Sequence, residues 1–310
     1  MLSVVVFKSD GLKLELSDVL TMVINSDYDV PADDLAVTVP YNALLNDARS
    51  VQVFEQDKLI FEGRVDEIVN LTKHNEALTK LTARSLAGLL LDNEAEPVTY
   101  INPSAQFIFN RHLKPFGIKN CDGGEVPFYG SLKIEKGMTH WQVLKNFCRN
   151  RYDTLPRITA NGNALMTGGG DNKPILFGIG GISYFSLKES RRLYKLISEI
   201  KLKLKEFGEY SGSLKNENSA CRGTERVRYV NAATDKTTVK TADKMIENSN
   251  QSSYVLALEC PGCLLDTLGK RAEVNDRLLS KIDNLRVTTV RYTLSRDGEF
   301  SSVVLRKEKF

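Results

Sequence analysis

The sequence has few of the side chains that usually build metal and redox centres. Its 310 residues include 3 histidines and 5 cysteines. An odd number of mostly scattered cysteines does not resemble the disulfide framework of a secreted domain. None of His74, His112 and His140 has a cysteine or carboxylate at ligand spacing, so we expect each to be solvated at the surface. We therefore predict no metal site and no cofactor.

The chain also lacks a long hydrophobic run. The apolar start MLSVVVF is interrupted by Lys8 and Asp10, and the most apolar later segment, SLAGLLL at 85–91, is much shorter than a membrane span. These patterns predict neither a signal peptide nor a membrane anchor. We expect a protein that is made and folds in the cytoplasm.

No charge of one sign dominates. The chain has 42 Lys and Arg against 39 Asp and Glu, a net charge of +3, so we expect no specific nucleic-acid binding. With 42% hydrophobic and 26% charged residues, the composition is that of a soluble globular protein, and the length favours two or three domains.

Motifs for enzymatic chemistry are missing as well. There is no G-x-S-x-G nucleophile motif, and TGGGD at 167–171 lacks the Gly-Lys-Ser/Thr that completes a phosphate-binding loop. No pair of carboxylates stands out from the 39 in the chain. We predict no catalytic residues, with one motif left to weigh: Cys260 and Cys263 form a C-x-x-C after the apolar run YVLALE.

The first part of the chain has the short alternating segments of a β-barrel or sandwich. The best strand spans Leu59–Leu71, and the turn-like KHNE joins it to ALTKLTA in a predicted hairpin. Turn residues separate the remaining predicted strands, which are LSVVVF, LKLEL, VLTMVI, LAVTVPY and SVQVFE.

The pattern of the middle segment, from Ser85 on, predicts a mixture of helices and strands. We predict a short helix in SLAGLLLDN, a second helix capped by Ser104, and a third capped by Thr139 that runs to Tyr152. In LPRITANGNALM, Asn161-Gly162 predicts the turn of a hairpin.

The last part returns to β after the connection TGGGDNKP. Its longest predicted strand is Tyr194–Lys205, followed by a polar loop over Gly208–Glu225 and the strand RVRYVNA. A short helix in TADKMIENSN, the strand YVLALE and a terminal hairpin from LRVTTVRYTL to FSSVVLRK complete the chain.

A stripe of lysines on the predicted strand Tyr194–Lys205 has two interpretations. We favour the solvated face of an amphipathic strand. The alternative is that these residues line a hydrophilic channel or an interface in a ring-shaped assembly, where basic side chains would suit the passage of a polyanion. The residues concerned are Lys195, Lys201, Lys203 and Lys205.

Four stretches spread over most of the chain resemble one family. They are LIFEGRVDEI, TARSLAGLLLDNEAEP, GMTHWQVLKNFCRNRYDTLPRITANG, and SYVLALECPGCLLDTLGKRAEVN together with the terminal hairpin. Their order resembles the baseplate hub proteins of contractile phage tails and R-type bacteriocins, the family of late control D proteins and PBSX-type tail hubs.

The resemblance implies an α+β, mainly β fold. Two tail-tube-like β-barrel domains, at 1–84 and 171–310, would flank an inserted small α/β domain at 85–170. It also implies a non-enzymatic homotrimer with pseudo-sixfold symmetry, which joins the hexameric tail tube protein to the trimeric central spike protein among other baseplate proteins. Such a hub would assemble in the bacterial cytoplasm, belong to a virion or bacteriocin tail, and let phage DNA pass through its ring.

The alternative is a tail-associated cell-wall hydrolase or a thiol-dependent protein that uses Cys260 and Cys263. In the resemblance, YVLALE is a barrel strand and Pro261-Gly262 the turn after it, which is good turn chemistry in its own right. We favour this turn over a redox or metal centre. The turn interpretation predicts that the thiols of Cys260 and Cys263 have pKa values near the ordinary one and bind no zinc.

Overall fold

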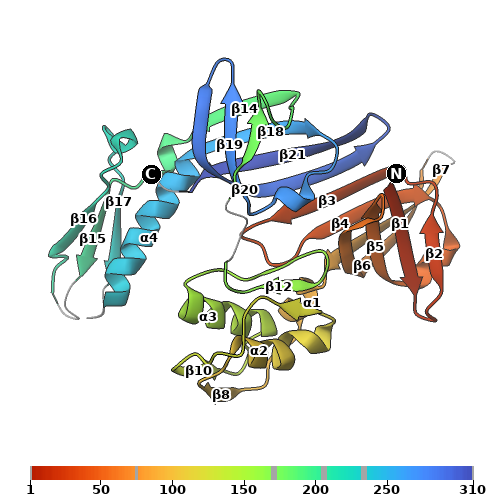
Figure 1. Cartoon of the computed structure of the whole chain (residues 1–310), viewed down its shortest axis with the longest axis horizontal. Helices are drawn as coiled ribbons and strands as arrows, with labels where there is room; N and C mark the ends of the chain where they lie inside the picture. The colour runs from red at the N-terminus through yellow and green to blue at the C-terminus, as the bar shows by residue number, and fades with distance from the viewer. Residues whose placement is uncertain (1, 74–75, 169–172, 204–207, 232–235, 309–310) are drawn as a thin grey trace. The chain divides into compact units, whose positions relative to one another are not determined.

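The structure is a computed structural model that describes residues 2–73, 76–168, 173–203, 208–231 and 236–308 (Figure 1). The chain divides into two compact units. Unit 1 consists of Met1–Asp171, Pro261–Leu268 and Thr289–Ser301, and unit 2 consists of Asn172–Cys260, Gly269–Thr288 and Ser302–Phe310. The fold is α+β and mainly β, as predicted. The domain boundaries at 84 and 170 stay predictions.

Unit 1 is built on an antiparallel arrangement of strands whose side chains alternate between buried and exposed. The order is β20-β3-β4-β7-β6-β5-β1-β2, in which β20 is Ser280–Ser295. In β3, for example, Met22 and Ile24 are fully buried. The predicted strands of this part are confirmed as β1 (Leu2–Lys8), β2 (Lys13–Leu16), β3 (Thr21–Asp27), β4 (Asp34–Pro40), β5 (Ala48–Glu55), β6 (Lys58–Lys73) and β7 (Glu76–Ser85). A 3-10 turn, η1 (Ala43–Asp47), precedes β5.

The predicted hairpin over β6 and β7 is confirmed, with Lys73 opposite Glu76. Its pairing shifts register between Val65 and Glu67, so the buried and exposed sides change within the strand. Gly63 lies on β6 where a Cβ atom would come within 2.3 Å of the Arg84 carbonyl oxygen, so no larger residue fits there.

The helical region, which we define as residues 85–168, contains two small sheets and three α-helices around one hydrophobic core. The core includes the buried side chains of Ile108, Leu113, Leu144 and Phe147. Its elements are α1 (Ala87–Asp92), β8 (Val98–Ile101), α2 (Ala105–Ile108), the π-helical turn η2 (Phe109–Leu113), the 3-10 turn η3 (Lys114–Phe116), β9 (Asn120–Cys121), β10 (Ser131–Ile134), α3 (His140–Tyr152), β11 (Arg157–Ile158) and β12 (Asn163–Leu165).

The local predictions for this region are confirmed. The Ser104 hydroxyl accepts a hydrogen bond from the Phe107 backbone N–H, and Thr139 forms a capping box with Gln142 at the start of α3. β11 and β12 form the predicted hairpin, and Gly162 adopts the left-handed conformation at its turn, with φ of 74°.

In unit 2 the strand order is β14-β18-β21-β20, with β19 beside β20 and β13 parallel to β19. β20 and β21 are the predicted terminal hairpin, and the predicted strand YVLALE extends through Pro261 as β18. The bounds are β13 (Ile175–Gly178), β14 (Ser186–Arg191), β18 (Tyr254–Pro261), β19 (Arg271–Asp276), β20 (Ser280–Ser295) and β21 (Gly298–Lys307). The 3-10 turn η6 (Leu265–Thr267), in unit 1, lies between β18 and β19 in the sequence.

A separate three-stranded sheet in unit 2, the open-faced sheet, packs one side against a long helix (Figure 1). It has the order β16-β15-β17, and Ile200, Leu202 and Ala242 form the buried contact between sheet and helix. The elements are the 3-10 turn η4 (Leu193–Lys195), β15 (Glu199–Lys203), β16 (Gly212–Lys215), the 3-10 turn η5 (Ser219–Cys221), β17 (Val227–Asn231) and α4 (Lys236–Ser253).

Three predictions for this segment are wrong in extent. The strand predicted over Tyr194–Lys205 begins only at Glu199, because Leu196 and Ile197 are both buried and do not alternate. The predicted polar loop at 208–225 contains β16, which pairs with β15. The predicted short helix is the 18-residue α4, whose polar first turns carry no hydrophobic pattern that sequence reasoning could use.

Candidate interaction face and the cysteine and histidine pairs

Side chains alternate along the strands of the open-faced sheet, so one set packs against α4 and the other set points away from it. Ile200 and its register partner Leu214 face the α4 side, as do Leu202 and Val230. The residues between them therefore point away from the helix. We call this side the open face; it comprises Glu199, Lys201 and Lys203 of β15, Ser213 and Lys215 of β16, and Val227, Tyr229 and Asn231 of β17.

The structure separates the four predicted lysines. Lys201 and Lys203 lie on the open face, whereas Lys195 belongs to the turn η4, where its Nζ atom lies 5.4 Å from the centre of the Tyr194 ring. Lys205 lies outside the described residues. The predicted stripe is thus two lysines on one strand, and its role as channel lining or interface stays a prediction.

Sequence reasoning missed Lys215 and Tyr229, two notable residues of the open face. Lys215 stands on β16 beside β15, and Tyr229 on β17 is the register partner of Lys201. The Tyr229 ring packs edge-on against Tyr210 at 4.9 Å between centres, and the Tyr210 hydroxyl donates a hydrogen bond to Asn231. The alternation in GSLK and RVRYVN is the signal that could have found them, but GSLK lies in the segment predicted as a polar loop.

The two cysteines of the C-x-x-C are both reduced. Burial raises the pKa of the Cys260 thiol to about 11 and that of the Cys263 thiol to about 12. Our prediction of ordinary thiol pKa values is therefore wrong, because the sequence did not reveal that Cys260 is buried and Cys263 partly buried. A raised pKa disfavours the thiolate, which is the form that attacks disulfides and binds metals.

The chain bends after β18 as predicted, with Pro261 still in the strand and the bend at Gly262. The strand ends at Pro261, and Gly262 adopts a left-handed backbone conformation with φ of 73°. The next strand, β19, begins at Arg271. Among the described residues, no group of three or more histidine, cysteine, aspartate or glutamate side chains is arranged to hold a metal ion.

Two histidines in the helical region are not solvated, contrary to prediction. His112 is buried and His140 half-buried, and their Nδ1 atoms lie 2.9 Å apart. The His112 Nε2 atom lies 3.2 Å from the Tyr100 hydroxyl, and Phe116 packs against His140. Burial lowers the pKa of His112 to about 4 and also lowers the pKa of His140. His74 lies outside the described residues.

The reason for this difference is the path of the chain after α2. The helix does not end before His112 but continues through the π-helical turn η2, which turns His112 toward the first residue of α3. Two histidines that lie 28 positions apart in the sequence therefore meet in space, which spacing alone could not indicate.

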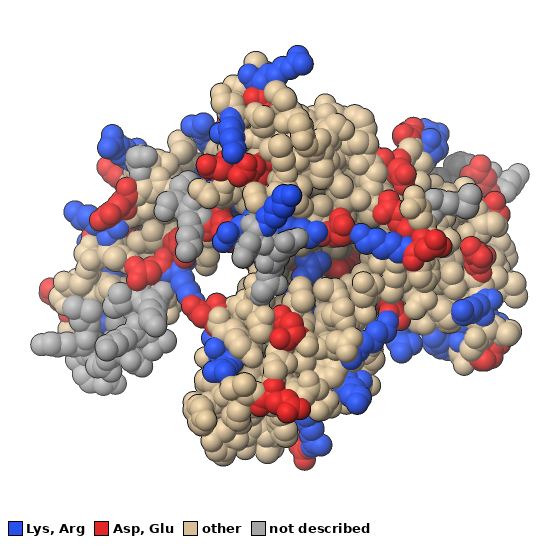
Figure 2. Space-filling view, in the orientation of Figure 1, with Lys and Arg blue, Asp and Glu red and all other residues tan. Residues whose placement is uncertain are grey.

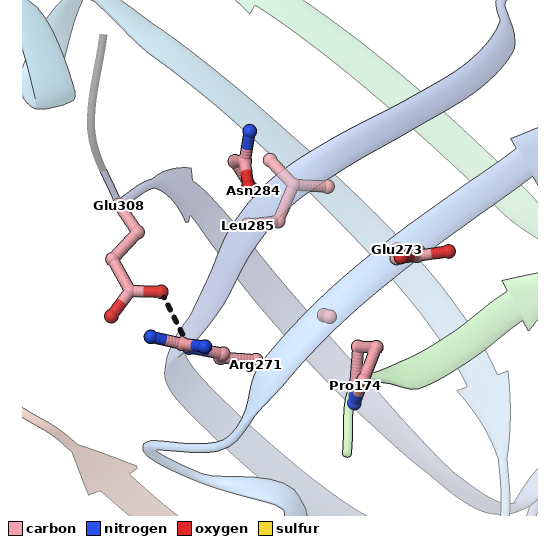
Figure 3. A pocket seen from close by; sticks show the side chains of 7 residues that line it. Pro174, Arg271, Glu273, Asn284, Leu285 and Glu308 are labelled. Atoms are coloured by element: carbon pink, nitrogen blue, oxygen red, sulfur yellow. Dashed lines mark ion pairs between the residues drawn. The ribbon is translucent and has the colours of Figure 1, made fainter. Parts of the chain in front are cut away.

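A pocket of about 290 Å³ lies in unit 2 beside β19, β20 and the end of the described chain (Figure 3). Arg271 and Glu308 point toward one another in it and form an ion pair of 3.2 Å, and Arg286 also pairs with Glu308. Glu273 is paired with Lys281 at 2.8 Å. The charged groups lining the pocket are thus already partnered, which gives it no clear ligand preference.

Basic and acidic side chains are interspersed over the face of the molecule shown in Figure 2, in keeping with the near balance of charge in the sequence. Within the described ranges, no helix is both long and apolar enough to cross a membrane.

Comparison with known proteins finds similarity in structure rather than in sequence. No family model matches the chain, and no curated protein matches it. A 43 kDa tail protein from prophage MuSo2 of Shewanella oneidensis is 14% identical, with a TM-score of 0.79 over 99% of this chain and 98% of that one. A tail protein from Neisseria meningitidis MC58 is 20% identical, with a TM-score of 0.78 over 99% of this chain and 97% of that one.

A more distant match is the c3393 protein of Escherichia coli, a component of the type VI secretion system with structural similarity to the T4 bacteriophage tail proteins gp27 and gp5. It is 10% identical, with a TM-score of 0.56 over 94% of this chain and 74% of that one. The chain thus shares its fold, over nearly its whole length, with proteins of phage tails.

Proposed function

We propose that this chain is the structural hub of a contractile-tail baseplate. One observation carries the proposal: the fold agrees with two tail proteins over 99% of this chain and at least 97% of theirs. Agreement over both full lengths makes a shared single domain an insufficient explanation. A common fold does not by itself establish a common role, so the proposal needs a test of assembly.

In this proposal the hub is a homotrimer. Each chain contributes two tube-like barrels, formed from 1–84 and 171–310, so that three chains make a ring of six similar domains that matches the hexameric tail tube. The other side of the ring would hold the trimeric central spike. A contact of one chain's surface with a different surface of the next, repeated three times, is sufficient to close such a ring.

The proposed role is structural rather than enzymatic. The strongest enzymatic candidate was the cysteine pair, and burial raises the pKa of both thiols, which works against a reactive thiolate. No contact or distance among the described residues favours the cell-wall hydrolase alternative.

Light scattering after size exclusion tests the assembly. We expect a particle of about 104 kDa, three times the 34.7 kDa chain, and ring-shaped particles in electron microscopy. A variant with Cys260→Ser and Cys263→Ser is the matched control for the enzymatic alternative and should assemble equally well. A strict monomer that never joins a tail tube or spike protein would overturn the hub proposal.

A further inference from the structure

The open face combines positive charge with an exposed aromatic ring. Lys201, Lys203 and Lys215 all project from it, and in the described part of the chain none of them forms an ion pair. Among the described residues that define the open face, Glu199 is the one carboxylate, and it accepts a hydrogen bond from the Ser213 hydroxyl. The face therefore carries more positive than negative charge, and α4 covers only the opposite side of the sheet.

The lysines are spaced to meet several negative charges at once. Side chains two positions apart on a strand are separated by about 7 Å, and neighbouring strands lie about 4.8 Å apart. Lys201 and Lys203 thus stand in a row along β15, and Lys215 lies on the neighbouring strand β16, opposite Glu199. A chain of phosphates can contact all three ammonium groups together and release its counterions, which a single carboxylate cannot do.

The aromatic side chains of this sheet favour a polyanion that also carries unpaired bases. Tyr229 is 60% exposed, on the strand next to the two lysines of β15, and its ring rests edge-on against Tyr210. The hydrogen bond from Tyr210 to Asn231 helps to hold this pair in place. An exposed, oriented ring beside lysines is suited to stacking an unpaired base, as in sheets that bind single strands.

An acidic peptide would neutralise the lysines but leave the Tyr229 ring without a matching partner. Double-stranded DNA would supply phosphates, yet its bases are already stacked on one another and are not free to meet the ring. A single strand offers both kinds of contact.

We propose that the open face of β15, β16 and β17 binds single-stranded nucleic acid without sequence preference. The phosphates contact Lys201, Lys203 and Lys215, and an unpaired base stacks on Tyr229. Such binding agrees with the low net charge, because it needs a local patch and not a basic domain. It does not depend on the hub proposal, since it is a property of the single chain.

Fluorescence anisotropy of a labelled oligothymidine of about 16 nucleotides, the upper size for one small binding fold, tests the proposal on the full-length protein. Binding should weaken steeply between about 50 and 200 mM salt. Replacing Lys201, Lys203 and Lys215 with glutamine should lower the slope of log affinity against log salt by about 2, given roughly 0.7 per phosphate contact on a single strand.

The matched control variant loses three positive charges outside the open-faced sheet. Lys80, Lys114 and Lys136 are exposed lysines outside the open-faced sheet, and a triple glutamine variant at these positions should keep the wild-type slope. Circular dichroism melts of both triple variants show whether each remains folded.

The stacking contact is tested separately. Tyr229→Ala should weaken binding by about 5- to 150-fold, the range for loss of one base–aromatic stack, while Tyr229→Phe, which keeps the ring, should bind nearly as the wild type does. A duplex of the same length should bind more weakly than the single strand and should be insensitive to Tyr229→Ala.

Three results would overturn the proposal. The first is no binding of the oligothymidine at the lowest salt concentration. The second is equal loss of binding in the two triple-lysine variants, which would indicate general attraction to a charged surface. The third is duplex binding at least as strong as single-strand binding, with no effect of Tyr229→Ala.

Discussion

The helical region and the open-faced sheet with α4 both combine helices with small sheets, but they differ in how many of their side chains are buried. In the helical region, the sheets and helices surround a single core, and even His112 is buried among aromatic neighbours. In the open-faced sheet, α4 covers one side, while the other presents lysines and a largely exposed tyrosine. The difference lies in which side chains alternate along the strands.

The difference is between side chains that stabilise the fold and side chains that are available for binding. A polar pair such as buried His112 and half-buried His140 is held by hydrogen bonds and contributes to the stability of one conformation. An uncovered sheet face with aligned charges contributes little to stability, so its composition is better explained by what it contacts. The following predictions test that division.

The largest effect is expected from the core of the helical region. Phe147→Ala should lower the free energy of unfolding by about 3–5 kcal/mol, because it removes a buried aromatic ring and leaves a cavity. Trp141, the only tryptophan, lies in α3 and reports local unfolding by its fluorescence during denaturation. Phe107→Ala, at a ring that is 42% exposed, is the control and should cost roughly 1 kcal/mol or less. Equal effects of the two variants would contradict the tight packing of this region.

A smaller effect is expected from acid acting on the histidine pair. In the folded protein the pKa of His112 is lowered from 6.5 to about 4, first by burial and then by the neighbouring His140 and Arg111. The unfolded chain thus binds this proton more readily, so the stabilisation is fully present above about pH 6.5 and is lost as pH falls toward 4. The expected loss is about 3 kcal/mol, from roughly 1.4 kcal/mol per pKa unit.

The measurement is Trp141 fluorescence in denaturant titrations between pH 7 and pH 4. A variant with glutamine at both His112 and His140 keeps hydrogen-bonding groups but cannot titrate in this range. The pH dependence should flatten in the variant. An unchanged dependence would show that other groups cause the acid sensitivity.

The smallest effect is expected on the open face. Replacing Lys201 and Lys203 with glutamine should change the free energy of unfolding by no more than about 0.5 kcal/mol, because neither lysine has an ion-pair partner among the described residues. Chemical denaturation followed by circular dichroism measures this change. A loss above about 1 kcal/mol would mean that the lysines support the fold, and the contrast between the two regions would weaken.

Local sequence signals predicted much of the fold. Ser104 and Thr139 cap helices where their spacing indicated, and Asn161-Gly162 makes its turn, because these residues act through bonds within a few positions. The long alternation of β6 and of the terminal hairpin was equally clear. Prediction was weakest at β16, a four-residue strand in a polar segment whose existence depends on pairing with β15.

The candidate site was only partly predictable. Lys201 and Lys203 were identified because they alternate on one strand, but Lys215 and Tyr229 join them only through neighbouring strands. For the cysteine pair the spacing suggested a site that the structure does not favour. Burial in the folded chain raises the pKa of both thiols, which makes a reactive thiolate unfavourable. Exposure and burial of a side chain depend on distant segments, which spacing does not encode.

The sequence by itself determined the mainly β fold class, the positions of most strands and caps, and the near balance of charge, because these follow from local periodicity and composition. Only the tertiary structure decided that His112 meets His140, that Cys260 is buried and Cys263 partly buried, and that lysines and a tyrosine from three strands share the face that points away from α4. Each of these depends on contacts between residues far apart in the chain, and their geometry exists only once the sheets and helices have packed.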